Sequence, residues 1–287
     1  MAVLGFLLFL QFSGMVLANV LELLDRFSGI AWLYPMGSRP RVHWRLPHFF
    51  VAWLMVVLLQ SGLYVFFGLI FESLNFDGKS SQAMLSVSAA NVLLILMIIL
   101  IAGPGWSMGL RRFGLMGPEI GRQWLIGFRA ALLISPWVYL INFIANRIFY
   151  STPHEVMKML DQDLNSVTAV LAGVSAVVFA PLAEEILFRG MLLGALIRKA
   201  KVRPASERKL PVQMANVATS LFFALLHANA WPAPIGIFVL SLFLGKLYIT
   251  TGRLWPCIAA HAMFNMTGVL GMLMAALAKE SGLIQGF

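Results

Sequence analysis

Long apolar runs alternate with short polar loops along the chain. The apolar runs lie near residues 2–24, 49–71, 84–103, 125–147, 167–197, 213–229, 234–250 and 256–278. About 20 apolar residues in a helix span the ~30 Å hydrocarbon core of a bilayer. We therefore predict an all-α, polytopic transmembrane helix bundle of about eight spans. The first run lacks the positive stretch that opens a signal peptide, so we expect a retained helix there.

The composition indicates the same class of protein. Of the 287 residues, 60% are apolar and 11% are charged, and the mean hydropathy is +0.85. No polar block is long enough to fold as a soluble domain, so we predict a single membrane domain over residues 1–287. The single cysteine, Cys257, excludes an intrachain disulfide and a cysteine-based metal cluster.

Basic residues divide the loops into two groups. The loops on one side of the membrane carry many Lys and Arg residues, whereas the loops and the C-terminal tail on the other side carry only Lys79, Lys158 and Lys279. Because Lys and Arg gather in cytoplasmic loops, both termini should face away from the cytoplasm. The basic cytoplasmic loops then explain the net charge of +9, so this charge does not indicate binding to nucleic acid. We expect these loops to contact anionic headgroups of the lipid bilayer. The basic side carries Arg26, Arg39, Arg41, Arg45, Arg111, Arg112, Arg122, Arg198, Lys199, Lys201, Arg203, Arg208, Lys209 and Arg253.

The run at 167–197 is unusual among these spans. It is too long for one straight crossing, and Pro181 interrupts it. Proline removes a backbone donor and kinks or restarts a helix. Such breaks are tolerated at membrane depth where they line a cavity, so we predict an active site in an intramembrane cavity. The ionisable residues Glu184, Glu185 and Arg189 follow the break directly, and ionisable residues in a membrane mark functional sites.

Helix geometry gives the two carboxylates different surroundings. Residues i and i+4 share a helix face, so Glu185 and Arg189 can pair, whereas Glu184 points about 100° away. Glu185 should then be held ionised by Arg189. Glu184 is left in poorly solvated surroundings, which is how a general base is prepared. The alternative is that both glutamates bind Arg189 and brace the kink.

His227 is expected at the same membrane depth as Glu184. Glu184 lies 14 residues before Arg198, and His227 lies 14 residues after Gln213. In regular helices both would be ~21 Å from the intervening basic loop. The alternative is a lone histidine that donates to a carbonyl of a neighbouring helix.

His261 and Asn265 are again spaced i, i+4, on the last predicted helix. Both side chains can donate hydrogen bonds to one small acceptor, and two donors aimed at one oxygen form an oxyanion hole. The alternative is a pair of interhelical hydrogen bonds. Since His261 follows soon after the start of its span, a tilted helix or a cavity open to the cytoplasm is needed to bring it level with His227.

Zinc is the competing chemical interpretation of these polar residues. Glu184, His227 and His261 are of the types that bind zinc in hydrolases. No H-E-x-x-H motif occurs, and the ligands would come from three helices without a paired-histidine anchor. We therefore predict no cofactor and keep zinc as the alternative.

Three short motifs occur in order on late apolar segments. "EEILFR" fits E-E-x-x-x-R, "FALLH" fits F-x-x-x-H, and "HAMFN" fits H-x-x-x-N. The set resembles the CAAX prenyl endopeptidase and bacteriocin-processing family (CPBP, also called Abi), which are intramembrane glutamate-type proteases. The resemblance covers roughly residues 165–270, and residues 1–150 carry no motif.

The resemblance implies a role for each motif position. Members are also described as metalloproteases, so a metalloendopeptidase activity is part of what it implies. The implied roles are water activation by Glu184 and His227, oxyanion stabilisation by His261 and Asn265, and a structural ion pair between Glu185 and Arg189.

We therefore predict a membrane-embedded peptide hydrolase that resembles CAAX-type endopeptidases. Its substrate would be a membrane-borne or lipidated peptide, and its location the bacterial plasma membrane, or the endoplasmic reticulum in a eukaryote. Two other classes stay open. One is a non-enzymatic immunity or scaffold protein that retains the motifs. The other is a transporter with a proton relay, for which inverted repeats are expected and none is evident.

Overall fold

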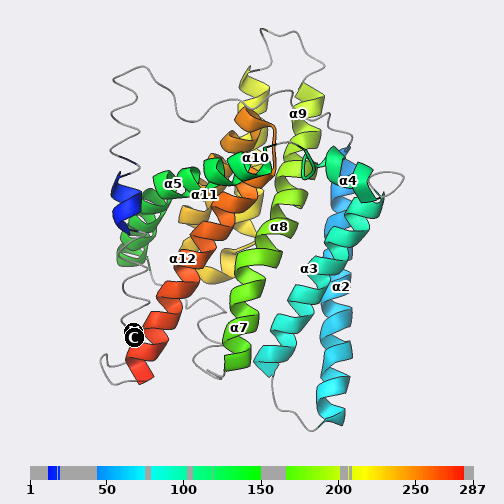
Figure 1. Ribbon diagram of the computed structural model, residues 1–287, viewed down its shortest axis with the longest axis vertical. Helices are drawn as coiled ribbons and strands as arrows, with labels where there is room; N and C mark the ends of the chain where they lie inside the picture. The colour runs from blue at the N-terminus through cyan, green and yellow to red at the C-terminus, as the bar shows by residue number, and fades with distance from the viewer. Residues whose placement is uncertain are drawn as a thin grey trace.

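The computed structural model describes residues 12–17, 19, 44–74, 79–101, 106–117, 119–149, 166–200, 206 and 209–280. The regular elements in these ranges are helices, arranged as a bundle (Figure 1). They are α2 (Leu46–Ser73), α3 (Lys79–Ile101), α4 (Trp106–Arg112), α5 (Ile120–Ile148), α7 (Ser166–Val174), η1 (Ser175–Phe179), α8 (Ala180–Glu185), η2 (Ile186–Leu193), α9 (Gly194–Ala200), α10 (Lys209–Leu225), η4 (Ala228–Ala230), α11 (Ala233–Thr251) and α12 (Trp255–Glu280).

Six of the described helices are long and apolar enough to cross a membrane. The chain is therefore an integral, multi-pass membrane protein, as the hydropathy pattern predicts. The expected span at 2–24 lies largely outside the described residues, so it stays a prediction. The six helices are Leu46–Ser73, Lys79–Ile101, Ile120–Ile148, Ala169–Ala200, Ala233–Thr251 and Trp255–Ala275.

The span predicted at 213–229 is shorter than expected. Its helix, α10, ends at Leu225 and has 17 residues, which rise ~25 Å rather than the ~30 Å of a full crossing. Pro232 is the N-cap residue of α11 and Pro234 lies in its first turn, where the missing N–H of proline leaves no helical hydrogen bond unmade. The chain therefore turns through η4 and returns as α11, which places His227 in the turn and not within a helix.

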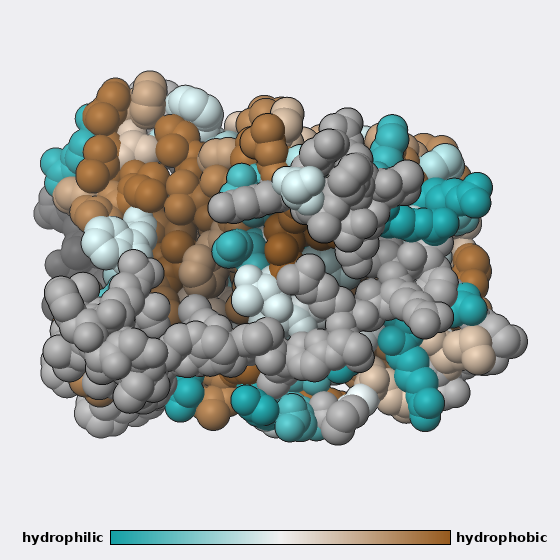
Figure 2. Space-filling model, turned by 90° about the horizontal axis from the view of Figure 1, so that it is seen from above, coloured by the Kyte–Doolittle hydropathy of each residue, from teal (hydrophilic) through white to brown (hydrophobic). Residues whose placement is uncertain are grey.

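Basic side chains gather at one end of the bundle. In Figure 1, α2 and α12 run down from this end, and α3 and the α7–α9 segment run up to it. Figure 2 views this end from above and shows hydrophilic residues spread over it with apolar surface between them. α12 ends at the opposite end, as the predicted orientation requires. The exposed basic residues of this end include Arg45, Arg111, Arg122, Arg198 and Lys199.

Small residues let neighbouring helices approach closely. A Cβ at Gly127 of α5 would lie 2.4 Å from the carbonyl oxygen of Pro256 on α12, so only glycine fits this crossing. Between α10 and α11, Asn216 Nδ2 donates to the Leu242 carbonyl at 3.0 Å. Helices in a membrane lack a strong hydrophobic drive to associate, so close backbone packing and interhelical hydrogen bonds hold the bundle.

The unusual segment is one helical run from Ser166 to Ala200 that changes type. Two π-helical stretches, η1 and η2, flank the short α8. The N–H of Ala180 bonds to the carbonyl of Ser175, five residues back, and Pro181 follows at the start of α8. The break predicted at Pro181 is therefore a local change of helix type, and the helix continues through it. π-helical turns are rare and occur mostly at functional sites.

Candidate active site

A buried ion pair joins the end of α8 to η2. Arg189 Nη1 donates to Glu185 Oε1 at 2.8 Å, and the two side chains are 1% and 0% exposed. This is the pairing that the i, i+4 spacing predicts. The guanidinium also donates through Nη2 to Ser241 of α11, at 2.8 Å to the hydroxyl and 3.2 Å to the carbonyl oxygen. The arginine therefore links the helical run Ser166–Ala200 to α11.

His261 of α12 lies between the two glutamates. Its Nδ1 is 2.8 Å from Glu185 Oε1, and its Nε2 is 3.7 Å from Glu184 Oε2. His261 itself is almost fully buried, whereas the Glu184 side chain is 28% exposed. Glu184 is thus the carboxylate with access to a water molecule or a substrate, and Glu185 is enclosed by protein.

His227 and His261 both face the ring of Phe223. The ring centroids are 4.9 Å apart for Phe223 and His227, and 6.1 Å apart for Phe223 and His261. His227 Nδ1 lies 2.9 Å from the Phe223 carbonyl oxygen, on its own chain segment. Among the described residues, Glu184 and His227 form no direct hydrogen bond or ion pair, so the expected water-holding contact would require a bridging molecule.

Asn265 of α12 contacts the helical run Ser166–Ala200. Its Nδ2 donates to the Ala176 carbonyl in η1 at 2.8 Å. An amide nitrogen has two N–H groups, so one remains for another acceptor. Next to it, Tyr139 of α5 stacks on Phe264 at a centroid distance of 5.0 Å and donates from its hydroxyl to the Phe264 carbonyl. The interhelical bond considered as the alternative for Asn265 is therefore present.

The comparison with protein families finds one match, to the segment that holds all of these motif residues. Residues 166–267 match the family described as type II CAAX prenyl endopeptidase Rce1-like. This segment belongs to the Rce1-like family. That family consists of membrane proteases, so the resemblance found from the three motifs is confirmed. Comparisons with curated proteins and with solved structures find no match.

The alternative zinc interpretation concerns Glu184, His227 and His261. Within the described residues, no group of three His, Cys, Asp or Glu side chains is arranged to hold a metal ion. His261 Nδ1 faces Glu185 and His227 Nδ1 faces a backbone carbonyl, so each ring has only Nε2 left for another ligand. The geometry therefore gives the metalloendopeptidase interpretation no support.

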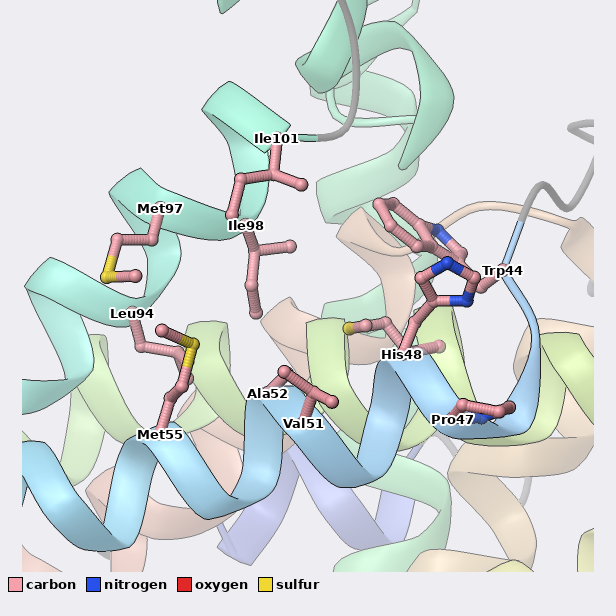
Figure 3. Close-up of a pocket in the computed structure, with 11 residues that line it drawn as sticks. Trp44, Pro47, His48, Val51, Ala52, Met55, Leu94, Met97, Ile98 and Ile101 are labelled. Carbon is pink, nitrogen blue, oxygen red and sulfur yellow. The ribbon is translucent and has the colours of Figure 1, made fainter.

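An apolar pocket lies between α2, α3 and Met191 of the Rce1-like segment. Its volume is about 190 Å³. Figure 3 shows Trp44, Pro47 and His48 at one end and Met55, Leu94 and Met97 at the other. Val51, Ala52, Ile98, Ile101 and Met191 complete the lining, and Met191 alone comes from the Rce1-like segment. None of the predicted catalytic residues lines this pocket, so it is distinct from the predicted active-site cavity.

Two residues of the site carry no role in the sequence-based prediction. Phe223 is the first residue of the F-x-x-x-H motif, and its ring lies 5.0 Å from the Arg189 guanidinium as well as beside both histidines. The motif spacing was a signal for Phe223, since residues i and i+4 share a face. Ser241 gave a weaker signal, as a serine within an otherwise apolar stretch of α11.

Proposed function

We propose that the chain is a membrane-embedded peptide hydrolase in which Glu184 acts as the general base. The observation that carries the proposal is the contrast between two adjacent carboxylates. Glu185 is fully buried and bonded to Arg189 and His261, whereas Glu184 is partly exposed and lies 3.7 Å from His261. Adjacent carboxylates in different environments are a recurring acid–base arrangement.

His227 is proposed to position the attacking water. With the Nδ1 proton donated to the Phe223 carbonyl, a neutral His227 presents Nε2 as an acceptor. A water molecule held by this nitrogen could give its second proton to Glu184. The turn that holds His227 lies after a helix too short to cross the hydrocarbon core, and irregular backbone at such depth occurs where it lines a cavity or is buried in protein.

His261 and Asn265 are proposed to stabilise the oxyanion that forms on the scissile carbonyl. His261 Nε2 faces Glu184, and Asn265 retains one amide N–H after its bond to Ala176. Loss of one donor to an oxyanion typically lowers kcat by ~10²–10³-fold. Both residues lie on α12, so one helix would carry the pair.

The proposed substrate is a membrane-borne or lipidated peptide. The pocket at α2 and α3 is lined by apolar side chains except at His48, and methionines in it can adapt to a flexible hydrocarbon chain. The lipid of the peptide would enter there from the bilayer. We place the protein in the bacterial plasma membrane, or in the endoplasmic reticulum of a eukaryote.

The test is cleavage of paired peptides by the purified protein in detergent. One peptide carries a farnesylated CAAX sequence and the other has the same sequence without the lipid. We expect cleavage of the lipidated peptide, with product masses that add up to substrate plus one water, and no effect of a chelator. A folded protein that cleaves neither peptide would favour the immunity or scaffold interpretation, and loss of cleavage with chelator would favour a metal mechanism.

A further inference from the structure

The contact between His261 and Glu185 fixes the position of one proton. Arg189 is always protonated, so its partner Glu185 is an ionised carboxylate that can only accept hydrogen bonds. A carboxylate oxygen 2.8 Å from an imidazole nitrogen requires a proton between them. His261 must therefore carry its proton on Nδ1.

This proton position limits what the other ring nitrogen can do. In a neutral imidazole one nitrogen donates and the other accepts. With the proton on Nδ1, the Nε2 of neutral His261 is an acceptor, and it points at Glu184 from 3.7 Å. Neutral His261 therefore cannot donate from Nε2 to an oxyanion until Nε2 receives a proton, and Glu184 is the neighbour that can supply one.

We propose that Glu185 is a positioning residue that makes His261 the proton carrier of the reaction. By holding Nδ1–H, Glu185 keeps Nε2 vacant to receive from Glu184 the proton taken from water. A carboxylate that orients a histidine and stabilises its protonated form is an established device for proton transfer. This inference rests on the proposed hydrolase function and adds the route of the proton to it.

The proton transfers balance over one turnover. Water loses a proton to Glu184 while its oxygen bonds to the scissile carbonyl carbon, whose oxygen becomes the oxyanion. Glu184 passes the proton to His261 Nε2, and the imidazolium then donates this N–H to the oxyanion. When the C–N bond breaks, Nε2 gives the proton to the leaving nitrogen, and Glu184 and neutral His261 are restored.

The surroundings of Glu185 are those expected of a residue with this task. Within the described part of the chain, both of its polar contacts are made by Oε1, and Oε2 has no hydrogen-bond partner. His261 thus supplies one of these two contacts to a fully buried carboxylate. Phe223 packs edge-on against the imidazole at 81° between ring planes, which restricts rotation of the ring away from Glu185.

The first test is the protonation of His261 in the resting protein, without any substrate. Nitrogen NMR of ¹⁵N-histidine-labelled protein distinguishes protonated from unprotonated ring nitrogens, and loss of the signals in His261→Gln assigns them. We expect Nδ1 protonated and Nε2 unprotonated at neutral pH. A resting His261 protonated at Nε2 would overturn the proposal, whether or not a peptide substrate has been found.

The second test removes the buried ion pair as a unit, which avoids leaving Arg189 unpaired. Glu185→Leu with Arg189→Met has no acceptor for Nδ1–H, whereas Glu185→Gln with Arg189→Met retains an amide oxygen. We expect kcat of the Leu variant to fall by ~10²–10⁴-fold with KM within a few-fold of the wild type, and the Gln variant to recover much of it.

A folded Leu variant with wild-type kcat would show that Glu185 serves the fold alone and would overturn the proposal. If the Leu variant does not fold, the NMR result on the wild type decides. If the wild type cleaves no peptide, the proposed hydrolase function fails, while the nitrogen spectrum still reports the proton position.

Discussion

Arg189 Nη1 lies 2.8 Å from Glu185 Oε1 in a place where neither side chain reaches the surface. The pair connects α8 and η2 to two further helices, because Arg189 also binds Ser241 on α11 and Glu185 also contacts His261 on α12. The proposed catalytic arrangement and the packing of the bundle therefore depend on the same charges.

Removal of the arginine alone should destabilise the protein strongly. Arg189→Ala leaves an ionised or neutralised Glu185 buried without its partner, and breaking one side of a buried pair typically costs ~3–5 kcal/mol. Thermal unfolding in detergent, followed by circular dichroism, measures the effect. The Glu185→Gln, Arg189→Met variant is the control and should recover most of the loss. An Arg189→Ala protein as stable as the wild type would contradict the structural importance of the pair.

Gly127 should tolerate no side chain, in contrast to another glycine on the same helix. A Cβ at Gly127 meets the Pro256 carbonyl at 2.4 Å, so Gly127→Ala must push α5 and α12 apart and should cost ~1–3 kcal/mol. A Cβ at Gly121 would meet no other described residue within 4 Å, and Gly121→Ala should be neutral or stabilising by up to ~1 kcal/mol. Equal melting temperatures for the two variants would show that the close crossing is absent.

Phe223 should affect activity beyond its effect on stability. Its ring contacts the Arg189 guanidinium and both histidines, so Phe223→Leu should lower stability by about 1–3 kcal/mol and lower kcat of the folded protein. Phe222→Leu is the matched control, since Phe222 packs on Phe49 and Phe188. We expect the control to lose stability without loss of kcat. Equal kcat values for the two variants, measured on folded protein, would remove Phe223 from the site.

Filling the apolar pocket should impair the use of a lipidated substrate. Ala52 is buried and lines the pocket, so Ala52→Phe should raise KM for a lipidated peptide by at least about tenfold, corresponding to ~1.4 kcal/mol of lost binding. Leu58→Phe, at an exposed position of the same helix, should leave KM unchanged. Unchanged KM in Ala52→Phe would show that the hydrocarbon chain binds elsewhere.

Much of the architecture follows from hydropathy and helix spacing alone. The long apolar runs predict the six long helices, because length and apolar character decide whether a helix can cross a membrane. The i, i+4 rule predicts the contact of Glu185 with Arg189, since it depends only on local helix geometry. The three motifs also identify the family of the segment 166–267.

Features that depend on tertiary contacts could not be predicted from the sequence. The spacing of His261 and Asn265 indicates a shared face, but their partners, Glu185 and the Ala176 carbonyl, come from another helix. The early end of α10 at Leu225 is concealed by hydropathy averaging over a long window. The expectation that Glu184 and His227 lie at the same membrane depth assumed two regular helices, whereas His227 lies in the turn after α10.

The most direct measurement of the central claim is the turnover of Glu184→Gln beside that of Glu72→Gln, on a peptide that the wild type cleaves. Glu72 is an exposed glutamate near the end of α2, so its substitution controls for loss of a carboxylate. We predict that Glu184→Gln remains folded and loses at least ~10²-fold in kcat, while Glu72→Gln matches the wild type. A folded Glu184→Gln protein that turns over at the wild-type rate would contradict the assignment of Glu184 as the general base.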